Sequence, residues 1–159
     1  MKNHLTISVI LLLGIFLSCS TSETGTKNNP MILDELPNLN NLFHPRGVPD
    51  FSLLISSSEL SNAYSVNCKN INYYVAVNDF KKVIYISTDD ESFVTSEKLN
   101  INSTLSDVRN ITDNDISIEK GWAFFIPLES GWNAAFVKGE SMTDGILDMD
   151  SKISFFFKK

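Results

Sequence analysis

Residues 71–88, INYYVAVNDFKKVIYIST, decide the fold of this chain. The two halves, Ile71–Val77 and Lys82–Thr88, are dominated by β-branched and aromatic residues, which favour extended strands. Residues 78–80 (NDF) lie between the halves, and Asn and Asp tolerate the backbone conformations of turns. The stretch therefore predicts a β-hairpin.

The C-terminal part of the chain predicts more strands of the same kind. Trp122–Leu128 and Trp132–Val137 flank residues 129–131 (ESG), which predicts a second hairpin. Because proline cannot donate to a strand ladder, Pro127 indicates an edge strand or a strand end. Lys152–Phe157 is the last predicted strand. Alternation gives each strand one apolar set: Trp122, Phe124 and Ile126; Trp132, Ala134 and Phe136; Ile153, Phe155 and Phe157.

One short helix is predicted between the hairpins. Ser103 or Thr104 can cap its first turn, and Asp107 lies three residues after Thr104, as in a capping box. The helix ends near Asn110, and its apolar face consists of Leu105, Val108 and Ile111.

Two further segments, Phe51–Ile55 and Phe93–Thr95, are predicted to be strands. With the two hairpins and the helix, they define the expected fold class. That class is α+β, with a small antiparallel sheet and one short helix, preceded by a signal peptide and a flexible tether.

The N-terminal residues predict export. The apolar run Leu5–Leu17 follows the positively charged Lys2. It is shorter than the roughly 20 residues of a membrane-spanning helix. Its length fits the core of a signal peptide. Residues 16–20 (FLSCS) end this run with a small residue directly before a cysteine.

This ending resembles the lipobox of bacterial lipoproteins in its looser, Bacteroidetes-like form. Ser18 and Cys19 match the motif, whereas Phe16 and Leu17 depart from its usual residues. The resemblance implies a lipid on the thiol of Cys19, a membrane anchor and, because Ser20 follows the cysteine, placement in the outer membrane. The alternative is an ordinary secretory signal with a cysteine by chance near the cleavage site.

Three segments are therefore expected along the chain. Residues 1–18 are the lipoprotein signal peptide, residues 19–30 are the lipidated cysteine with a flexible tether, and residues 31–159 are a single α+β domain. Ser20–Pro30 has no hydrophobic residue, so it cannot bury surface to offset the entropy of ordering. Met31–Asp50 is a lead-in rich in Leu, Asn and Pro, expected to pack leucines onto the core.

The charge of the mature chain argues against nucleic acid as a partner. Removing Met1–Ser18 takes one Lys from the 13 Lys and Arg residues and none of the 19 acids, which leaves 12 against 19, a formal charge of −7. Nucleic-acid binders normally carry a basic stripe, and the sequence has none.

Few residues of the mature chain suit catalysis or metal binding. The mature chain has no nucleophile-elbow motif with which its single histidine, His44, could form a catalytic pair, and no Cys or His cluster lies near it. With lipid on Cys19, Cys68 would be the remaining thiol, expected to be a partly buried small residue and not a nucleophile. We therefore expect no catalytic residue, metal or cofactor. An acidic run without EF-hand spacing is expected to be a solvated loop: Asp144, Asp148 and Asp150.

The aromatic residues of the second hairpin are the candidate partner-binding residues: Trp122, Trp132, Phe124 and Phe136. The alternative, which alternation favours, is that these side chains form the core of a small sheet. Phe125 and Phe156 place further aromatics on the opposite face. Either the helix and lead-in cover that second face, or part of it is exposed to a partner.

A second resemblance concerns Leu99–Val108 and the Trp-bearing strands after it. A Ser/Thr-initiated helix ending in Asp-Val, followed by such strands, is similar to small envelope lipoproteins of the outer-membrane assembly accessory type and to β-lactamase-inhibitor-like domains. Asn102 stands where that family has Gly, and the family's preceding helical pair is not evident, so no functional residue transfers.

The expected function is that of a lipid-anchored envelope protein that binds or scaffolds an envelope protein partner without catalysis. Two alternatives stay open. One is an inhibitor or immunity-type protein whose acidic surface meets the basic cleft of an envelope enzyme. The other is a surface glycan binder that uses Trp122 or Trp132.

Overall fold

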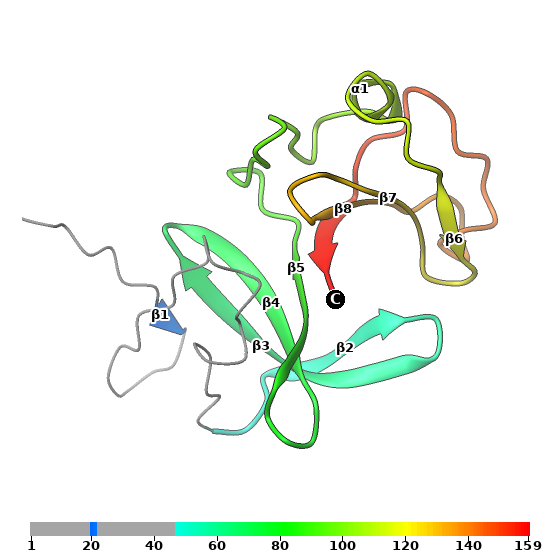
Figure 1. Ribbon diagram of the computed structural model, residues 1–159. Coiled ribbons are helices and arrows are strands. Elements are labelled where there is room, and N and C mark those ends of the chain that lie inside the picture. The colour runs from blue at the N-terminus through cyan, green and yellow to red at the C-terminus, as the bar shows by residue number, and fades with distance from the viewer. Residues whose placement is uncertain (1–19, 22–46) are drawn as a thin grey trace, which may run out of the picture.

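The computed structural model describes residues 20–21 and 47–159 (Figure 1). These residues form one α-helix, α1 (Leu105–Arg109), and nine strands. The strands are β1 (Ser20–Thr21), β2 (Phe51–Ser56), β3 (Glu59–Cys68), β4 (Ile71–Val77), β5 (Val83–Thr88), β6 (Ser117–Glu119), β7 (Ala123–Pro127), β8 (Asn133–Phe136) and β9 (Phe155–Lys158).

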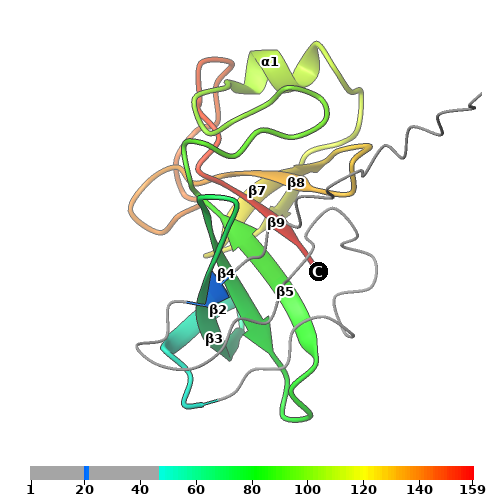
Figure 2. The same cartoon turned by 90° about the vertical axis from the view of Figure 1, so that its left-hand side faces the viewer.

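The described strands make a single antiparallel sheet that bends into a half-barrel (Figures 1 and 2). Its order is β1-β3-β4-β5-β9-β8-β7-β6, and β2 pairs with β3 off this path. The predicted antiparallel sheet with one short helix is confirmed. The sheet is larger than expected, so the architecture is mostly β.

The hairpin predicted from residues 71–88 is confirmed as β4 and β5. Tyr74 pairs with Ser87 and Val75 pairs with Ile86, with an irregularity between Ala76 and Val77. The β5 strand also pairs with β9, which joins the N-terminal strands to the C-terminal ones. The hairpin is therefore central to the sheet and buried on both faces.

The longest strand, β3, is not predicted by the sequence. Its residues, ELSNAYSVNC, include Glu, Ser and Asn, which have low strand propensity. The strand forms because it has neighbours on both sides: β4 pairs along Asn62–Cys68, while β2 and β1 pair with its two ends on the other side. Pairing decided by distant segments overrides local propensity here.

The predicted capping box of α1 is confirmed. The Thr104 hydroxyl accepts from the Asp107 amide at 3.2 Å, and the Asp107 carboxylate accepts from the Thr104 amide at 2.7 Å. Leu105 and Val108 are buried as expected. Ile111 is 44% exposed because it lies beyond the C-cap, Asn110, so its prediction as part of the buried face is wrong.

Phe93–Thr95 is not a strand, which corrects another expectation. The segment lies between two turns, and the Thr95 amide donates to the Leu99 carbonyl within the same loop. Its buried residues, Phe93 and Thr95, instead pack inward from this loop.

The sheet buries an apolar cluster on each face. The helix-side core lies on the face covered by α1 and the loops around it, and includes Phe93, Leu105, Val108, Phe124, Trp132, Phe136 and Phe156. The hairpin-side core lies on the opposite face and includes Ile55, Ala63, Ala76, Tyr85, Trp122, Ala123, Ala135 and Phe157, with Phe51, Leu53, Phe125 and Phe155 against it. Because the sheet bends, side chains of β2 cover the hairpin-side core.

Two predicted apolar faces are wrong because the strands begin later than expected. β7 begins at Ala123, so Trp122 belongs to the preceding turn and enters the hairpin-side core, whereas Phe124 enters the helix-side core. Likewise β9 begins at Phe155, and Ile153 packs in the helix-side core, opposite Phe155 and Phe157.

Pro127 was predicted to mark either an edge strand or a strand end, and it marks a strand end. It is the last residue of β7, which lies between β6 and β8 and is therefore not an edge strand. At a strand end the missing amide donor leaves no gap in the ladder.

The predicted signal peptide, Cys19 and the lead-in up to residue 46 lie outside the described residues. Within the predicted tether, Ser20 and Thr21 pair with Asn67 and Val66 of β3, a pairing that the sequence does not predict. In the part of the chain that the structure describes, no helix is long and apolar enough to cross a membrane.

Cys68 corrects a further expectation. Its side chain is buried, at 1% exposure, and is disulfide-bonded, and no described cysteine is a free thiol. The burial is more complete than the partial burial expected, and the prediction of a remaining thiol is wrong.

Candidate functional site

A pocket of about 280 Å³ opens where β2 approaches the central hairpin. Its volume is near the lower limit of the range of small-molecule sites, roughly 300–1,000 Å³. Seven lining residues are apolar or aromatic and four are polar: Leu53, Leu54, Tyr74, Tyr85, Trp122, Met142 and Phe155, with Ser87, Thr88, Asp89 and Ser154. The pocket therefore collects residues from β2, β4, β5 and β9 and from three loops or turns.

Trp122 forms one wall of the pocket and is fixed by the turn between β6 and β7. Gly121 has φ +76°, a left-handed conformation that glycine adopts without strain, and the Trp122 amide donates to the Glu119 carbonyl at 3.0 Å. The indole Nε1–H donates to the Leu54 carbonyl at 3.1 Å. The ring is thereby tied to both β2 and β6.

Four aromatic rings surround the Trp122 indole, with centroids 4.9 to 6.3 Å away: Phe157, Phe155, Phe125 and Tyr85. All four contacts have the edge-to-face geometry that the ring quadrupoles favour. The wall is therefore rigid before any ligand arrives.

Glu119 joins the two ends of the bent sheet beside this wall. Its Oε1 accepts from the Ser57 amide at 2.6 Å, and its Oε2 lies 3.6 Å from the Lys159 ammonium, which also sits 4.2 Å from the centre of the Trp122 ring. Burial alone would raise the pKa of Glu119, but the hydrogen bonds from Ser57 and the charge of Lys159 outweigh it and lower the pKa.

Asp89 and the two tyrosines form the polar side of the pocket. The pKa of Tyr74 is raised chiefly by the negative charge of Asp89, with burial and a hydrogen bond to that carboxylate adding to the effect. Burial also raises the pKa of Tyr85, and this effect outweighs a hydrogen bond with Ser87 that lowers the pKa. Both hydroxyls are therefore protonated at neutral pH, and Tyr74 donates to Asp89.

The lining hydroxyl groups already have partners inside the protein. The Thr88 hydroxyl donates to the Asn72 carbonyl at 2.7 Å, and that of Ser154 accepts from the Val137 amide at 3.0 Å. These contacts hold the pocket's shape, and the Asp89 carboxylate, with about four acceptor positions, keeps spare hydrogen-bonding capacity.

Only one of the four candidate partner-binding residues lines this pocket. Trp122 does, while Trp132, Phe124 and Phe136 pack in the helix-side core, and all four are at most 7% exposed. The residues that complete the site come from elsewhere. Nothing in the sequence indicated that Tyr85 and Asp89 would lie near Trp122. The β5 strand and the β6–β7 turn come together only because the sheet bends.

Trp132 lies beside a polar contact that ties three segments together. The Glu97 carboxylate accepts from the Ser130 amide at 2.6 Å, and the Lys158 ammonium donates to the Ser130 carbonyl at 3.0 Å while lying 5.0 Å from the centre of the Trp132 ring. The arrangement holds the turn between β7 and β8 against the loop before α1, which is a structural role.

Glu97→Gln is expected to reduce the stability of the protein at neutral pH and to make that stability less sensitive to a fall in pH. Burial raises the pKa of Glu97, but hydrogen bonds, the Ser130 amide first among them, outweigh it and lower the pKa below its ordinary value of 4.5. A lowered folded-state pKa contributes stability above the unfolded-state value, and this is lost as pH falls through the folded-state value.

The measurement is urea unfolding between about pH 3 and 7, with Glu91→Gln as the control, because Glu91 is an exposed acid on the preceding loop. If the two variants lose stability in parallel at every pH, the assignment to the Ser130 contact is wrong.

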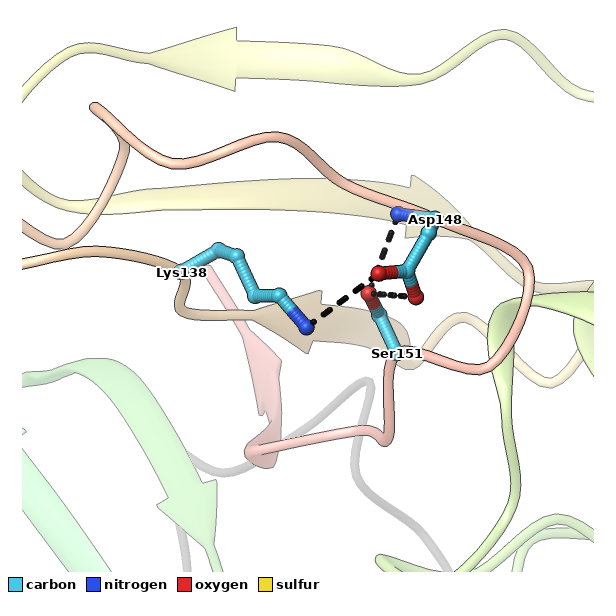
Figure 3. A network of polar contacts seen from close by, with 3 residues as sticks. All are labelled: Lys138, Asp148 and Ser151. Atoms are coloured by element: carbon cyan, nitrogen blue, oxygen red, sulfur yellow. Dashed lines mark hydrogen bonds and ion pairs between the residues drawn. The ribbon is translucent and has the colours of Figure 1, made fainter.

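The acidic run at residues 144–150 is divided among separate contacts. The Asp148 carboxylate accepts from the Ser151 hydroxyl at 2.8 Å and lies 3.6 Å from the Lys138 ammonium, as Figure 3 shows. Asp144 instead accepts from the Ser141 amide at 2.9 Å. Among the described residues, no group of three or more His, Cys, Asp or Glu side chains is placed to hold a metal ion.

Compared with protein-family models, with curated proteins and with solved structures, the chain matches none of them, so its own residues carry the functional argument.

Proposed function

We propose that this protein is a lipid-anchored envelope protein that acts by binding and not by catalysis, with the pocket beside Trp122 as its binding site. The observation that supports binding is a preformed cavity with apolar walls and one carboxylate, Asp89, that has spare acceptor capacity. Apolar walls with a few placed polar groups are typical of small-ligand sites. Among the described residues that line this cavity, no nucleophile is held by a general base.

The proposed anchor rests on residues 16–20 (FLSCS) after the apolar run Leu5–Leu17. Each CH2 group placed in the bilayer contributes about 0.8 kcal/mol, so the several acyl chains of a bacterial lipoprotein hold far more firmly than one chain. The proposed place is the outer membrane, facing either the periplasm or the surface, with a membrane contact through Cys19.

Cys19→Ala is expected to move the protein from the membrane fraction to the soluble fraction and to abolish incorporation of labelled fatty acid. Cys68→Ala is the matched control, since it removes the other cysteine and leaves the motif intact. It should keep both the label and the membrane association. Undiminished labelling of the Cys19 variant would contradict the anchor.

Lipidation and the disulfide of Cys68 are chemical alternatives. The chain contains two cysteines, so a thioether on Cys19 removes the other sulfur available for a disulfide within this chain. Intact mass spectrometry under non-reducing conditions separates the two forms. The lipoprotein gains acyl mass, whereas the oxidised chain lacks two hydrogens and returns to its full mass on reduction, a result that would support the ordinary secretory signal.

A second candidate function, inhibition of an envelope enzyme, is favoured by the acidic balance of 19 Asp and Glu against 13 Lys and Arg in the whole chain. Negative surfaces associate rapidly with basic clefts. Capture experiments with the mature protein distinguish inhibition of an enzyme from scaffolding of an envelope protein partner. Salt-sensitive recovery of one soluble enzyme, with loss of that enzyme's activity, would support inhibition, whereas barrel or cell-wall proteins would support scaffolding.

A further inference from the structure

We propose that the pocket binds a small organic cation, an ammonium group carried on an aromatic or aliphatic body, with the ammonium paired to Asp89. This inference rests on the proposed function of the pocket as a binding site, and it is independent of the lipid anchor.

The size and walls of the pocket define the body of the ligand. A cavity of about 280 Å³ is large enough for one aromatic ring with a short chain. Leu53, Leu54, Met142 and Phe155 supply apolar contacts, and Trp122 adds an aromatic wall. Removing an apolar ligand surface from water contributes about 25 cal/mol per Å².

The charge of the walls defines the head group. Among the described residues that line the pocket, Asp89 is the one acidic side chain, and none is Lys or Arg. Lys159, whose ammonium lies 4.2 Å from the centre of the Trp122 ring, is already paired with Glu119. An anionic ligand would therefore face uncompensated negative charge, whereas a cation would neutralise it.

Asp89 is positioned for this role. The Tyr74 hydroxyl donates to its carboxylate, which takes one of about four acceptor positions. Asp89 itself is exposed at the mouth, so a bound ammonium would keep part of its hydration and donate to the remaining positions. Tyr74 also lines the cavity, and the face of an aromatic ring attracts cations within about 6 Å.

The same geometry disfavours a sugar ring. Stacking a sugar requires an open aromatic face, but Trp122 is 2% exposed and Tyr85 is 3% exposed. The Tyr85 ring stacks on Phe157 at 5.8 Å, and the Lys159 ammonium lies 4.2 Å from the centre of the Trp122 ring. The hydroxyl groups of Thr88 and Ser154, which a sugar would need, already bond to the backbone.

The test uses the mature protein in a non-ionic detergent and three probes of matched shape: phenethylamine, 2-phenylethanol and 3-phenylpropanoate. The chain has two tryptophans, so its NMR spectrum has two indole N–H signals. The Trp122 signal reports the pocket because its Nε1–H bonds to Leu54, and the buried Trp132 signal is the internal control.

Phenethylamine is expected to shift the Trp122 signal saturably, leave the Trp132 signal unchanged, and bind at least about tenfold more tightly than the neutral alcohol, with the anion weakest. Asp89→Asn should reduce the affinity for the amine to that for the alcohol. Asp113→Asn, which removes the same charge from an exposed loop elsewhere, should leave the preference intact.

Three outcomes would overturn the inference. One is equal binding of amine and alcohol, and another is an unchanged preference in the Asp89 variant. The third is no saturable shift in protein whose melting transition is intact. Should Asp89→Asn prove unstable, Leu54→Trp at the rim provides the second variant. It keeps the charge and fills the cavity, so it should abolish binding of the amine and the alcohol alike.

The three probes distinguish failure of the cation inference from failure of the proposed binding function. A protein that binds the alcohol and the amine equally at Trp122 still has a binding pocket. A protein in which no probe shifts the Trp122 signal lacks one, even if fatty-acid labelling confirms the anchor.

Discussion

Trp122→Ala is expected to lower the free energy of unfolding by about 3–5 kcal/mol, the usual cost of truncating a large buried aromatic side chain. Small domains are stable by only about 5–15 kcal/mol, so this single change would leave the protein close to unfolded. The side chain is 2% exposed and lies among four other rings. Its loss would open a cavity between β2 and the rest of the sheet.

Urea unfolding of the mature protein, followed by circular dichroism, measures this effect. Phe80→Ala is the matched control, because Phe80 is 84% exposed in the β4–β5 turn and its truncation should change stability by less than about 0.5 kcal/mol. Trp122→Phe separates packing from hydrogen bonding, since it keeps most of the ring but leaves the Leu54 carbonyl without its donor. Equal stabilities of the alanine variants would refute the assignment of Trp122 to the core.

Gly139→Ala is expected to cost roughly 2–5 kcal/mol, from about 1–2 for a left-handed backbone and about 1–3 for forced overlap. Gly139 has φ +91°, and a Cβ at this position would collide with the Asp144 carboxylate and come 2.6 Å from the Gly145 amide nitrogen. The side chain of Asp144 can move, but it would lose its bond from the Ser141 amide. The backbone of Gly145 cannot move freely, because its amide donates to the Lys138 carbonyl.

Gly121→Ala is the matched control for this prediction. Gly121 has φ +76°, but no atom lies within 4 Å of the position of its Cβ, so only the backbone term of about 1–2 kcal/mol applies. The difference between the two variants in thermal or urea unfolding therefore measures the overlap alone. A Gly139 variant no less stable than the Gly121 variant would show that the loop adjusts without cost.

Local sequence was sufficient wherever local chemistry decides the structure. The hairpin of residues 71–88 follows from two β-rich runs around Asn78 and Asp79, and α1 follows from the capping pair Thr104 and Asp107. Both depend on interactions between residues close in the chain. The same reasoning failed for β3, whose polar residues become a strand because three other strands pair with it.

Strand boundaries decided which candidate residues share a face. Alternation from Trp122 puts it with Phe124, but β7 starts one residue later, and the turn at Gly121 directs the indole to the other side of the sheet. Side chains alternate only within a strand, so alternation does not place a residue of the preceding turn. The four candidate aromatics are buried, as the core alternative predicts, and they divide between two cores.

The sequence by itself determined the antiparallel hairpins, the capped helix, the acidic balance and the expectation of a lipid anchor at Cys19. Only the tertiary structure decided that Trp122, Tyr85 and Asp89 line one pocket, since β2, β5 and the β6–β7 turn are far apart in the chain. The physical reason is the bend of the sheet, which brings Leu54 within hydrogen-bonding distance of Trp122 and Ser57 within that of Glu119. Such closure depends on the packing of the whole sheet, for which no short stretch of sequence carries a signal.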